Sequence, residues 1–202
     1  VYDAKNFQGK EQTKALLEGV QGYSMERIGL PLFLAVEEIG GNGHSPLAVE
    51  TKYGLQASPA VLGAGGAPEK AAEAAAAIAE YLKAESFNLN LMPVAGLAPD
   101  MEESQQSRCY GADSATVAMM LAESVTACRN GGIGTAVGYF PWKGAQPGCT
   151  KRLTEWQDSD GLAFGAAVNA GTDLVMLSNA SFEAMTREGN KPCSLSGGAV
   201  SY

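Results

Sequence analysis

The residues from Gly134 to Lys151, GTAVGYFPWKGAQPGCTK, begin as an apolar strand and open into a loop rich in glycine, proline and aromatic side chains. A loop that follows a strand is where an α/β enzyme usually carries its catalytic groups. This loop contains no His, Asp or Glu, the residue types that most often transfer protons near neutral pH. Its aromatics Tyr139, Phe140 and Trp142 could stack on a ring of a bound ligand, although packing in the core or at the rim is at least as good an interpretation.

Three other groups of residues could do chemistry. Glu37 and Glu38 could act as an acid–base pair, but neighbours at a strand end point to opposite faces, which favours one inward and one solvated carboxylate. Arg108 is equally well interpreted as a clamp for a carboxylate or sugar and as a structural ion-pair partner. Cys149 and His44 could form a thiol–imidazole nucleophile, a weaker hypothesis because the sequence shows no feature that would lower the thiol pKa.

Composition excludes several function classes. The 202 residues are 46% hydrophobic and 18% charged, as in a globular domain, and no apolar run reaches transmembrane length. The 14 basic and 22 acidic residues give a net charge of −8, so we expect no nucleic-acid partner. No two cysteines form a CxxC pair, and we expect neither a metal site nor a cofactor. Free thiols are favoured, and the sequence assigns no disulfide to the four cysteines, Cys109, Cys128, Cys149 and Cys193.

Apolar runs and helical patterns alternate along the chain. The sequence predicts strands at Leu30–Val36, Phe87–Val94, Ile133–Tyr139 and Asp173–Ser178, the first of them covered on both faces. It predicts helices at Gln8–Ile28, Pro68–Glu85, Asp113–Arg129 and Asp160–Asn169. This alternation indicates one α/β domain, residues 1–202, with parallel strands and right-handed crossovers.

The long loops follow the predicted strands, whereas the loops that precede them are short. We therefore expect the functional face at the carboxyl ends of the strands. The loops of that face are Glu37–Ala67, Ala95–Ala112, Phe140–Ser159 and Asn179–Tyr202. The pattern alone leaves open whether the sheet is doubly wound or a (β/α) barrel.

Five stretches, in order and with matching gaps, resemble the N-terminal barrel domain of glycoside hydrolase family 3, of the β-N-acetylglucosaminidase type. They are GLPLFLAVEEIGG (29–41), NLNLMPVAGL (88–97), RCYG (108–111), AGTDLVMLSN (170–179) and CSLS (193–196). The first helix also resembles that of the family. The resemblance covers essentially the whole chain and implies a TIM-barrel-like fold of which roughly half to two-thirds of the strands are present, since a closed barrel has eight.

The resemblance also indicates which family residues are changed. The loop that carries K-H-F-P-G-H-G-D-T-x-x-D-[ST]-H in the family begins here at Gly138 and Tyr139, in place of the sugar-binding Lys-His pair. The catalytic Asp-x-His dyad falls on Cys149, Thr150 and Lys151, which could not replace it without rearrangement.

The other sugar-contacting positions mostly differ as well. The strand-two Asp corresponds to Glu37 and Arg108 is unchanged, whereas Ile39, Ser45 and Asn179 stand where the family has an acidic residue, an Arg and a His. The family nucleophile lies on a later strand, and residue 202 falls about where that strand would start.

The sequence therefore predicts a family 3-like domain that has lost its catalysis and could still bind a glycan. Its predicted substrate-binding residues are Glu37, Arg108, Tyr139, Trp142 and Lys143. The expected partner is an N-acetylglucosamine-containing glycan or a peptidoglycan fragment. Two alternatives stay open, namely part of an active O-glycosyl hydrolase and a structural or interaction module. An incomplete barrel would also expose apolar strand surface. This favours a homodimer over an open sandwich with helices on both faces, and a lid formed by the segment after Asn179 is the other alternative. The residues do not fix the cellular location, with a lean toward the cell surface.

Overall fold

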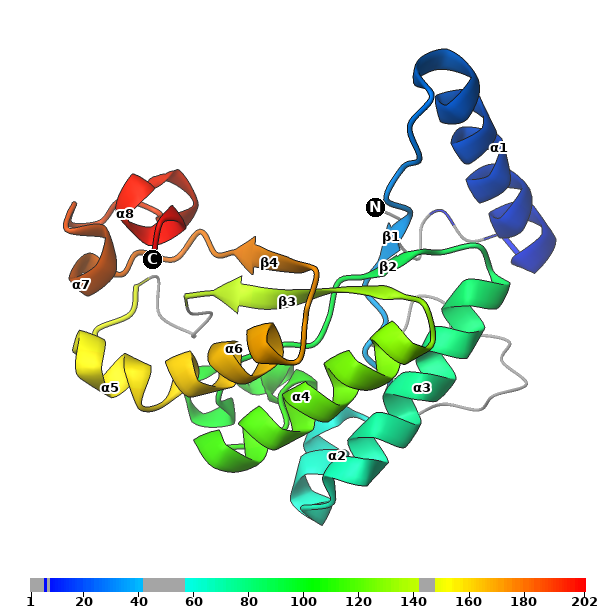
Figure 1. The fold of residues 1–202 in the computed structure, drawn as a ribbon. Coiled ribbons are helices and arrows are strands. Elements are labelled where there is room, and N and C mark those ends of the chain that lie inside the picture. Colours follow the sequence, from blue (N-terminus) through cyan, green and yellow to red (C-terminus); the bar gives the residue numbers. More distant parts are fainter. Residues whose placement is uncertain (1–5, 7, 42–56, 142–147) are drawn as a thin grey trace.

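The computed structural model of the chain describes residues 6, 8–41, 57–141 and 148–202 (Figure 1). Its strands are β1 (Ala35–Val36), β2 (Leu89–Asn90), β3 (Gly134–Phe140) and β4 (Leu174–Leu177). Its α-helices are α1 (Lys10–Ile28), α2 (Pro59–Gly65), α3 (Pro68–Ala84), α4 (Ser114–Asn130), α5 (Leu153–Gln157), α6 (Asp160–Asn169), α7 (Glu183–Thr186) and α8 (Gly197–Val200). The loops contain the 3₁₀ helices η2 (Ala98–Asp100), η3 (Glu103–Arg108) and η4 (Cys193–Leu195).

The strands form one sheet in the order β1-β2-β3-β4, and every neighbouring pair is parallel. A parallel neighbour requires a crossover, and α3, α4 and α6 lie in the three connections between successive strands. The prediction of an α/β fold built from parallel (β/α) units is therefore confirmed. Within the described ranges the sheet does not close on itself, as expected for an incomplete barrel.

Helices α3, α4 and α6 cover one face of the sheet (Figure 1). The largest core cluster lies there and includes Val117, Leu121, Val137 and Phe164, each at most 4% exposed. The other face is concave and opens upward in Figure 1. Helix α1 stands at its β1 end, and α7 and α8 stand at its β4 end. None of the described helices is long and apolar enough to cross a membrane.

The first two strands are much shorter than predicted, and β2 is Leu89–Asn90 where Phe87–Val94 was expected. Only Ala35 and Val36 are in β1, and the preceding apolar run is not covered on both faces, since Leu30 is 62% and Phe33 is 73% exposed. The amide of Asn88 explains the shortening of β1: its Oδ1 accepts from Leu34 N at 2.7 Å and its Nδ2 donates to the Leu32 carbonyl at 2.8 Å. A side chain thus takes over backbone hydrogen bonds that a longer strand would give to its neighbour.

The segment after Asn179 does not lie across the concave face. Its helices α7 and α8 pack at the β4 end of the sheet (Figure 1), where the Tyr202 hydroxyl accepts a hydrogen bond of 2.6 Å from Gln157 Nε2. The Tyr202 ring also packs edge-on against Trp156, with ring centroids 5.7 Å apart. The lid considered from the sequence is therefore wrong, because these aromatic contacts hold the segment to α5.

Two buried acids hold their protons to unusually high pH. The Cys128 thiol on α4 is 1% exposed, and burial raises its pKa from 9.0 to about 12. The Tyr110 hydroxyl shares a hydrogen bond of 2.7 Å with Ser124 Oγ, and burial raises its pKa from 10.0 to about 12. The unfolded chain would release both protons at lower pH than the folded chain, so the folded state binds more protons between these values.

We therefore predict that the free energy of unfolding falls as the pH rises from 9.0 to about 12. Urea denaturation at stepwise higher pH measures the effect. The variant Cys128→Ala is less stable at neutral pH but should show a shallower fall on the alkaline side, because one of the two protons is gone. Equal slopes for the two proteins would show that the Cys128 thiol does not cause the dependence.

Candidate functional site

Three predicted site residues meet at the carboxyl ends of the strands. Glu37 directly follows β1, Arg108 ends η3 in the loop after β2, and Tyr139 lies near the end of β3. The pairing of β3 with β4 shifts register between Gly138 and Phe140, so Tyr139 falls at an irregularity of the ladder. Arg108 and Tyr139, which are 71 and 102 positions away from Glu37 in the sequence, thus contact its carboxylate.

The contacts centre on one oxygen of Glu37. The Tyr139 hydroxyl donates to Glu37 Oε1 at 2.8 Å, and Arg108 Nη2 forms an ion pair with the same oxygen. Arg108 Nη2 also lies 3.4 Å from the Tyr139 hydroxyl, and its Nη1 donates to Gln105 Oε1 at 2.9 Å. The side chain of Arg108 is 11% exposed and that of Glu37 is 36% exposed. The Arg108 guanidinium therefore lies on the inner side of the cluster, and the Glu37 carboxylate is the part of the cluster that solvent reaches.

Burial raises the pKa of Tyr139, and the hydrogen bond and negative charge of Glu37 raise it further. The phenol therefore stays protonated near neutral pH and donates to the carboxylate. Oxygen Oε2 of Glu37 has no hydrogen-bond partner among the described residues. The cluster thus offers a carboxylate oxygen held at a fixed position for a donor such as a hydroxyl group.

The neighbouring Glu38 points inward, as predicted, and is 4% exposed. Its backbone N–H and carbonyl both bond to the Asn90 amide at 2.9 Å, which fixes the chain just after β1. The other carboxylate, of Glu37, is 36% exposed, as the alternation predicts, and it is also bound by Arg108 and Tyr139. The two carboxylates do not share a site of the kind that acid–base catalysis would need.

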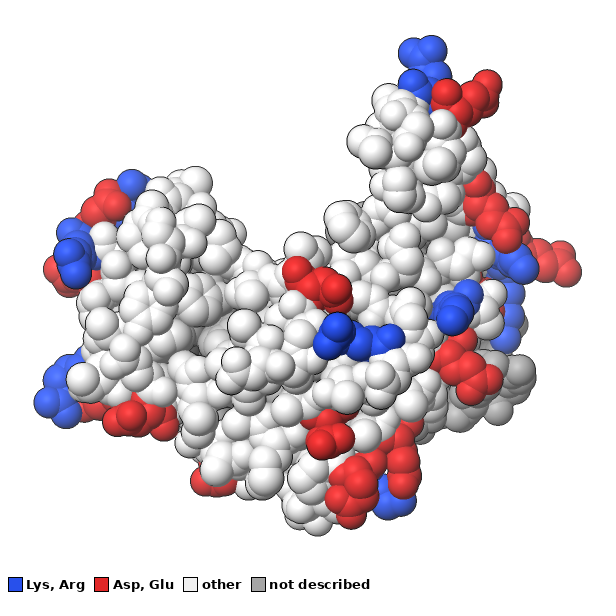
Figure 2. Space-filling view, viewed as in Figure 1, with Lys and Arg blue, Asp and Glu red and all other residues white. Residues whose placement is uncertain are grey.

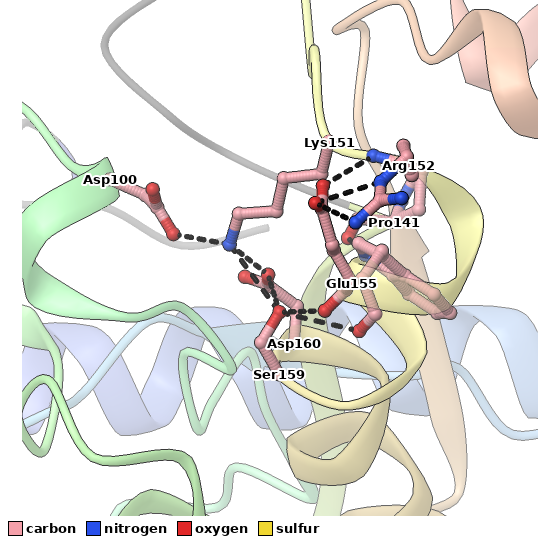
Figure 3. Close-up of polar contacts among 8 residues, drawn as sticks. Asp100, Pro141, Lys151, Arg152, Glu155, Ser159 and Asp160 are labelled. Atoms are coloured by element: carbon pink, nitrogen blue, oxygen red, sulfur yellow. Dashed lines mark hydrogen bonds and ion pairs between the residues drawn. The ribbon is translucent and has the colours of Figure 1, made fainter.

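A second polar cluster lies in the loop after β3, at the positions that the resemblance assigns to the catalytic dyad (Figure 3). The Lys151 ammonium lies between two carboxylates, 2.7 Å from Asp100 Oδ2 and 2.6 Å from Asp160 Oδ2. Ser159 Oγ lies 3.1 Å from the same Asp160 oxygen. Asp100 belongs to the loop after β2 and Asp160 begins α6, so Lys151 links three segments.

One ammonium faces two carboxylates in this cluster, so the negative charge is only partly compensated. Asp160 is 1% exposed, and burial raises its pKa although Lys151 opposes the shift. Burial works against the charge of Lys151, but its hydrogen bonds to Asp100 and Asp160 outweigh burial and raise the Lys151 pKa. The ammonium is therefore charged near neutral pH and fills the space between the carboxylates. A pair of catalytic carboxylates needs room for a sugar ring between them. The Lys151 ammonium takes that room here.

The remaining family positions are also occupied in ways that differ from the family pattern. Cys149 is 8% exposed and burial raises its pKa, so the thiol is a poor nucleophile. A Cβ at Gly138 would lie 2.7 Å from Cε of Met176, whose side chain takes the space beside the position of the family lysine. Oδ1 of Asn179 accepts from Ser194 Oγ at 2.6 Å.

Trp142, Lys143 and His44 lie outside the described residues, so the structure does not place them. Phe140, by contrast, is part of the core: its ring lies 5.6 Å from that of Trp156 and 5.3 Å from that of Phe164, both edge-on. For Phe140, packing rather than sugar stacking is the correct interpretation. No disulfide joins the four cysteines, and all four are buried.

A cleft of about 1000 Å³ is lined in part by Lys151. Its walls come from the loop before α5 and from the segment between β4 and η4, and they include Thr150, Arg152, Asn179, Ser181 and Asn190. Sequence reasoning missed this cleft and the two aspartates of the Lys151 cluster. In the sequence, only Asp160 could have pointed to the Lys151 cluster. An acidic residue at the start of a helix is also common without any such role.

Comparison with known proteins identifies related sequences and structures. The sequence model described as "Glycosyl hydrolase family 3 N terminal domain" matches residues 1–201. A curated relative from Cellulomonas fimi, "Beta-N-acetylglucosaminidase/beta-glucosidase", is 30% identical over 135 residues, which are 62% of this chain and 24% of the relative.

Two solved structures have the same fold. A glycoside hydrolase family 3 β-N-acetylglucosaminidase from Paenibacillus sp. str. FPU-7 matches with a TM-score of 0.85 at 26% identity, over 98% of this chain and 39% of that one. NagZ from Neisseria gonorrhoeae, in complex with N-trifluoroacetyl-D-glucosamine, matches with a TM-score of 0.82 at 22% identity, over 95% and 57%. The chain thus spans 24% to 57% of the length of these relatives, and the TIM-barrel-like fold is confirmed.

The Lys151 cluster predicts a large effect of a single substitution on stability. In Lys151→Met the buried Asp160 carboxylate loses its main counter-charge, so we expect a loss of about 3 kcal/mol in the free energy of unfolding. Lys151→Arg should retain most of the stability, and Arg152→Met is the matched control because its ion pair with Glu155 is solvent-exposed. Urea denaturation measures all three variants. Equal stability of Lys151→Met and Arg152→Met would contradict a structural role of Lys151.

Proposed function

This chain belongs to the family of glycosyl hydrolase family 3 N-terminal domains, and we propose that it binds an N-acetylglucosamine-containing glycan without hydrolysing it. The observation that carries the proposal is the contrast between two clusters at the carboxyl ends of the strands. The Glu37–Arg108–Tyr139 cluster keeps an accessible carboxylate, whereas the cluster at the dyad positions is closed by Lys151.

The binding half of the proposal rests on Glu37 and Arg108. A sugar presents hydroxyl groups that donate to carboxylates and accept from guanidinium or phenol groups, and bound ligands are usually oriented by a few such fixed polar groups. Glu37 Oε2 supplies an acceptor that Arg108 and Tyr139 hold in place through the other oxygen. By the resemblance, Glu37 and Arg108 also occupy two sugar-contacting positions of the family.

The glycan class comes from the relatives. The curated relative from Cellulomonas fimi and the Paenibacillus structure are both β-N-acetylglucosaminidases by name. The identity of 26% to 30% supports the same class of sugar, and this chain covers 39% or less of either protein. Chitobiose and muropeptide fragments are therefore the probes of choice.

The absence of turnover rests on the residues at the dyad positions. General acid–base catalysis needs a group that exchanges protons near neutral pH. The Lys151 pKa is raised by Asp100 and Asp160, and the Cys149 pKa is raised by burial, so both groups keep their protons there. Neither can alternate between acid and base during a reaction cycle. Asp160 is buried beneath Lys151 and cannot reach a sugar without opening the cluster.

We predict that isothermal titration detects binding of chitobiose or of a muropeptide fragment and that Glu37→Gln weakens it at least about tenfold, since a hydrogen bond to a charged acceptor is lost. Arg108→Gln should weaken it as well, because Glu37 loses its fixed position. The matched control is Arg129→Gln, since Arg129 lies on α4 and donates to the Ala170 carbonyl at the opposite end of the strands. Binding unaffected by Glu37→Gln would reject this site, and absent binding would reject glycan recognition.

A further inference from the structure

The concave face of the sheet carries an apolar layer of its own. Val36 and Val137 belong to the two core clusters that pack against the helices. Because side chains alternate along a strand, the residues before them, Ala35 and Ala136, face the concave side. The apolar layer there consists of Ala35, Leu89 and Ala136, with Leu91 and Met176 packed against them. The hollow above it, between α1 and the C-terminal helices, is walled mainly by uncharged residues (Figure 2).

Met176 brings this layer to the carboxyl ends of the strands. It pairs with Gly138 where β3 and β4 lie side by side. A Cβ at Gly138 would lie 2.7 Å from Met176 Cε and 3.4 Å from Met176 Cβ. The side chain of Met176 therefore crosses over the backbone of Gly138, in space that is open only because glycine has no side chain.

The Glu37 carboxylate stands on the same face and at the same end of the strands. Glu37 follows Ala35 by two residues, so its side chain faces the concave side as that of Ala35 does. Tyr139, whose hydroxyl donates to Glu37 Oε1 at 2.8 Å, directly follows Gly138. This end of the face thus has polar groups toward β1 and the apolar side chain of Met176 over β3.

A sugar ring has surfaces that match this arrangement. In a hexose with equatorial substituents, the hydroxyl groups lie around the edge of the ring and the C–H groups lie on its two faces. Ligand sites usually combine an apolar lining with a few fixed polar groups. A methionine suits the apolar part, because its flexible and polarizable thioether adapts to the surface that lies on it.

We propose that Met176 is the apolar floor of the glycan site. One face of an N-acetylglucosamine ring lies on the Met176 side chain, while a hydroxyl group at the edge of the ring donates to Glu37 Oε2. The inference rests on the glycan binding proposed above, and it adds the surface of the sugar that is recognised. It also gives Gly138 a role, since any side chain there would displace Met176.

Methyl-labelled methionine tests the contact directly. The chain has seven methionines, and the ε-methyl resonance of Met176 is the one that disappears in Met176→Leu. With chitobiose bound, we expect nuclear Overhauser effects between this methyl group and the ring C–H protons of the sugar. Met119 is the internal control, because it is 52% exposed but lies on α4, which covers the other face of the sheet. Its methyl group should show no such effect.

Isothermal titration with chitobiose measures what the contact contributes to binding. Met176→Leu should bind within about twofold of the unmodified chain, because it keeps an apolar side chain of similar volume. Met176→Gln should weaken binding at least about fivefold, because the sugar ring would cover an amide that loses its hydrogen bonds to water. Met119→Gln is the matched control and should bind normally. Thermal unfolding checks that all three variants fold.

The outcomes separate this inference from the proposed function. If chitobiose binds without an Overhauser effect to the Met176 methyl group, the contact is rejected and glycan binding at Glu37 stands. If the unmodified chain does not bind, glycan recognition is rejected and the Met176 floor with it. Equal affinities of Met176→Gln and Met119→Gln would reject a specific contribution of Met176.

Discussion

A buried carboxylate requires a counter-charge. In this chain the carboxylate is that of Asp160, and the loops of the functional face are arranged around its ion pair with Lys151. Asp160 begins α6 with 1% of its side chain exposed, and the Lys151 ammonium lies 2.6 Å away. The same ammonium reaches Asp100 in the loop after β2 at 2.7 Å. Desolvation makes an unpaired charge at this depth costly, so the loop after β3 must keep Lys151 in place. Lys151 therefore stabilises the loops of this face.

The two polar clusters divide the face into a closed part and an accessible part. Lys151 is bound to two carboxylates and is 23% exposed, whereas Glu37 uses one oxygen for Arg108 and Tyr139 and has 36% of its side chain exposed. Binding a sugar requires fixed donors and acceptors, while hydrolysing it requires groups that change protonation state. We propose that Glu37 and its neighbours meet the first requirement and that the groups around Lys151 do not meet the second.

The sequence predicted the candidate site best where a residue's position relative to the end of a strand decides whether it belongs to the site. Glu37, Arg108 and Tyr139 were predicted to converge because each follows the carboxyl end of a parallel strand, and the structure brings them into contact. The length of β1 was mispredicted because the Asn88 amide replaces backbone partners, which hydrophobicity does not encode. Helix α2 was missed because its sequence, PAVLGAG, contains too few residues and too much glycine for a helical period.

Tertiary pairing accounts for the rest of what the sequence left open. Asp100, Lys151 and Asp160 are up to 60 positions apart, and no local pattern links them before the loops are folded. The C-terminal segment was considered as a lid, yet Tyr202 is held by Gln157 and Trp156 at the β4 end. Both cases depend on contacts between side chains that only a three-dimensional arrangement can specify. The hydrophobic pattern of the sequence predicts the order of the strands, and the contacts between side chains fix the arrangement of the functional face.

Our central proposal is that this family 3 domain has a structural ion cluster in place of acid–base chemistry. The rate at which the purified chain releases the chromophore from a β-N-acetylglucosaminide tests it most directly. Loss of general acid–base catalysis alone costs about a hundred- to ten-thousandfold in rate, so the account predicts no release above the buffer background. Release that scales with protein concentration and disappears in Glu37→Gln would contradict the claim.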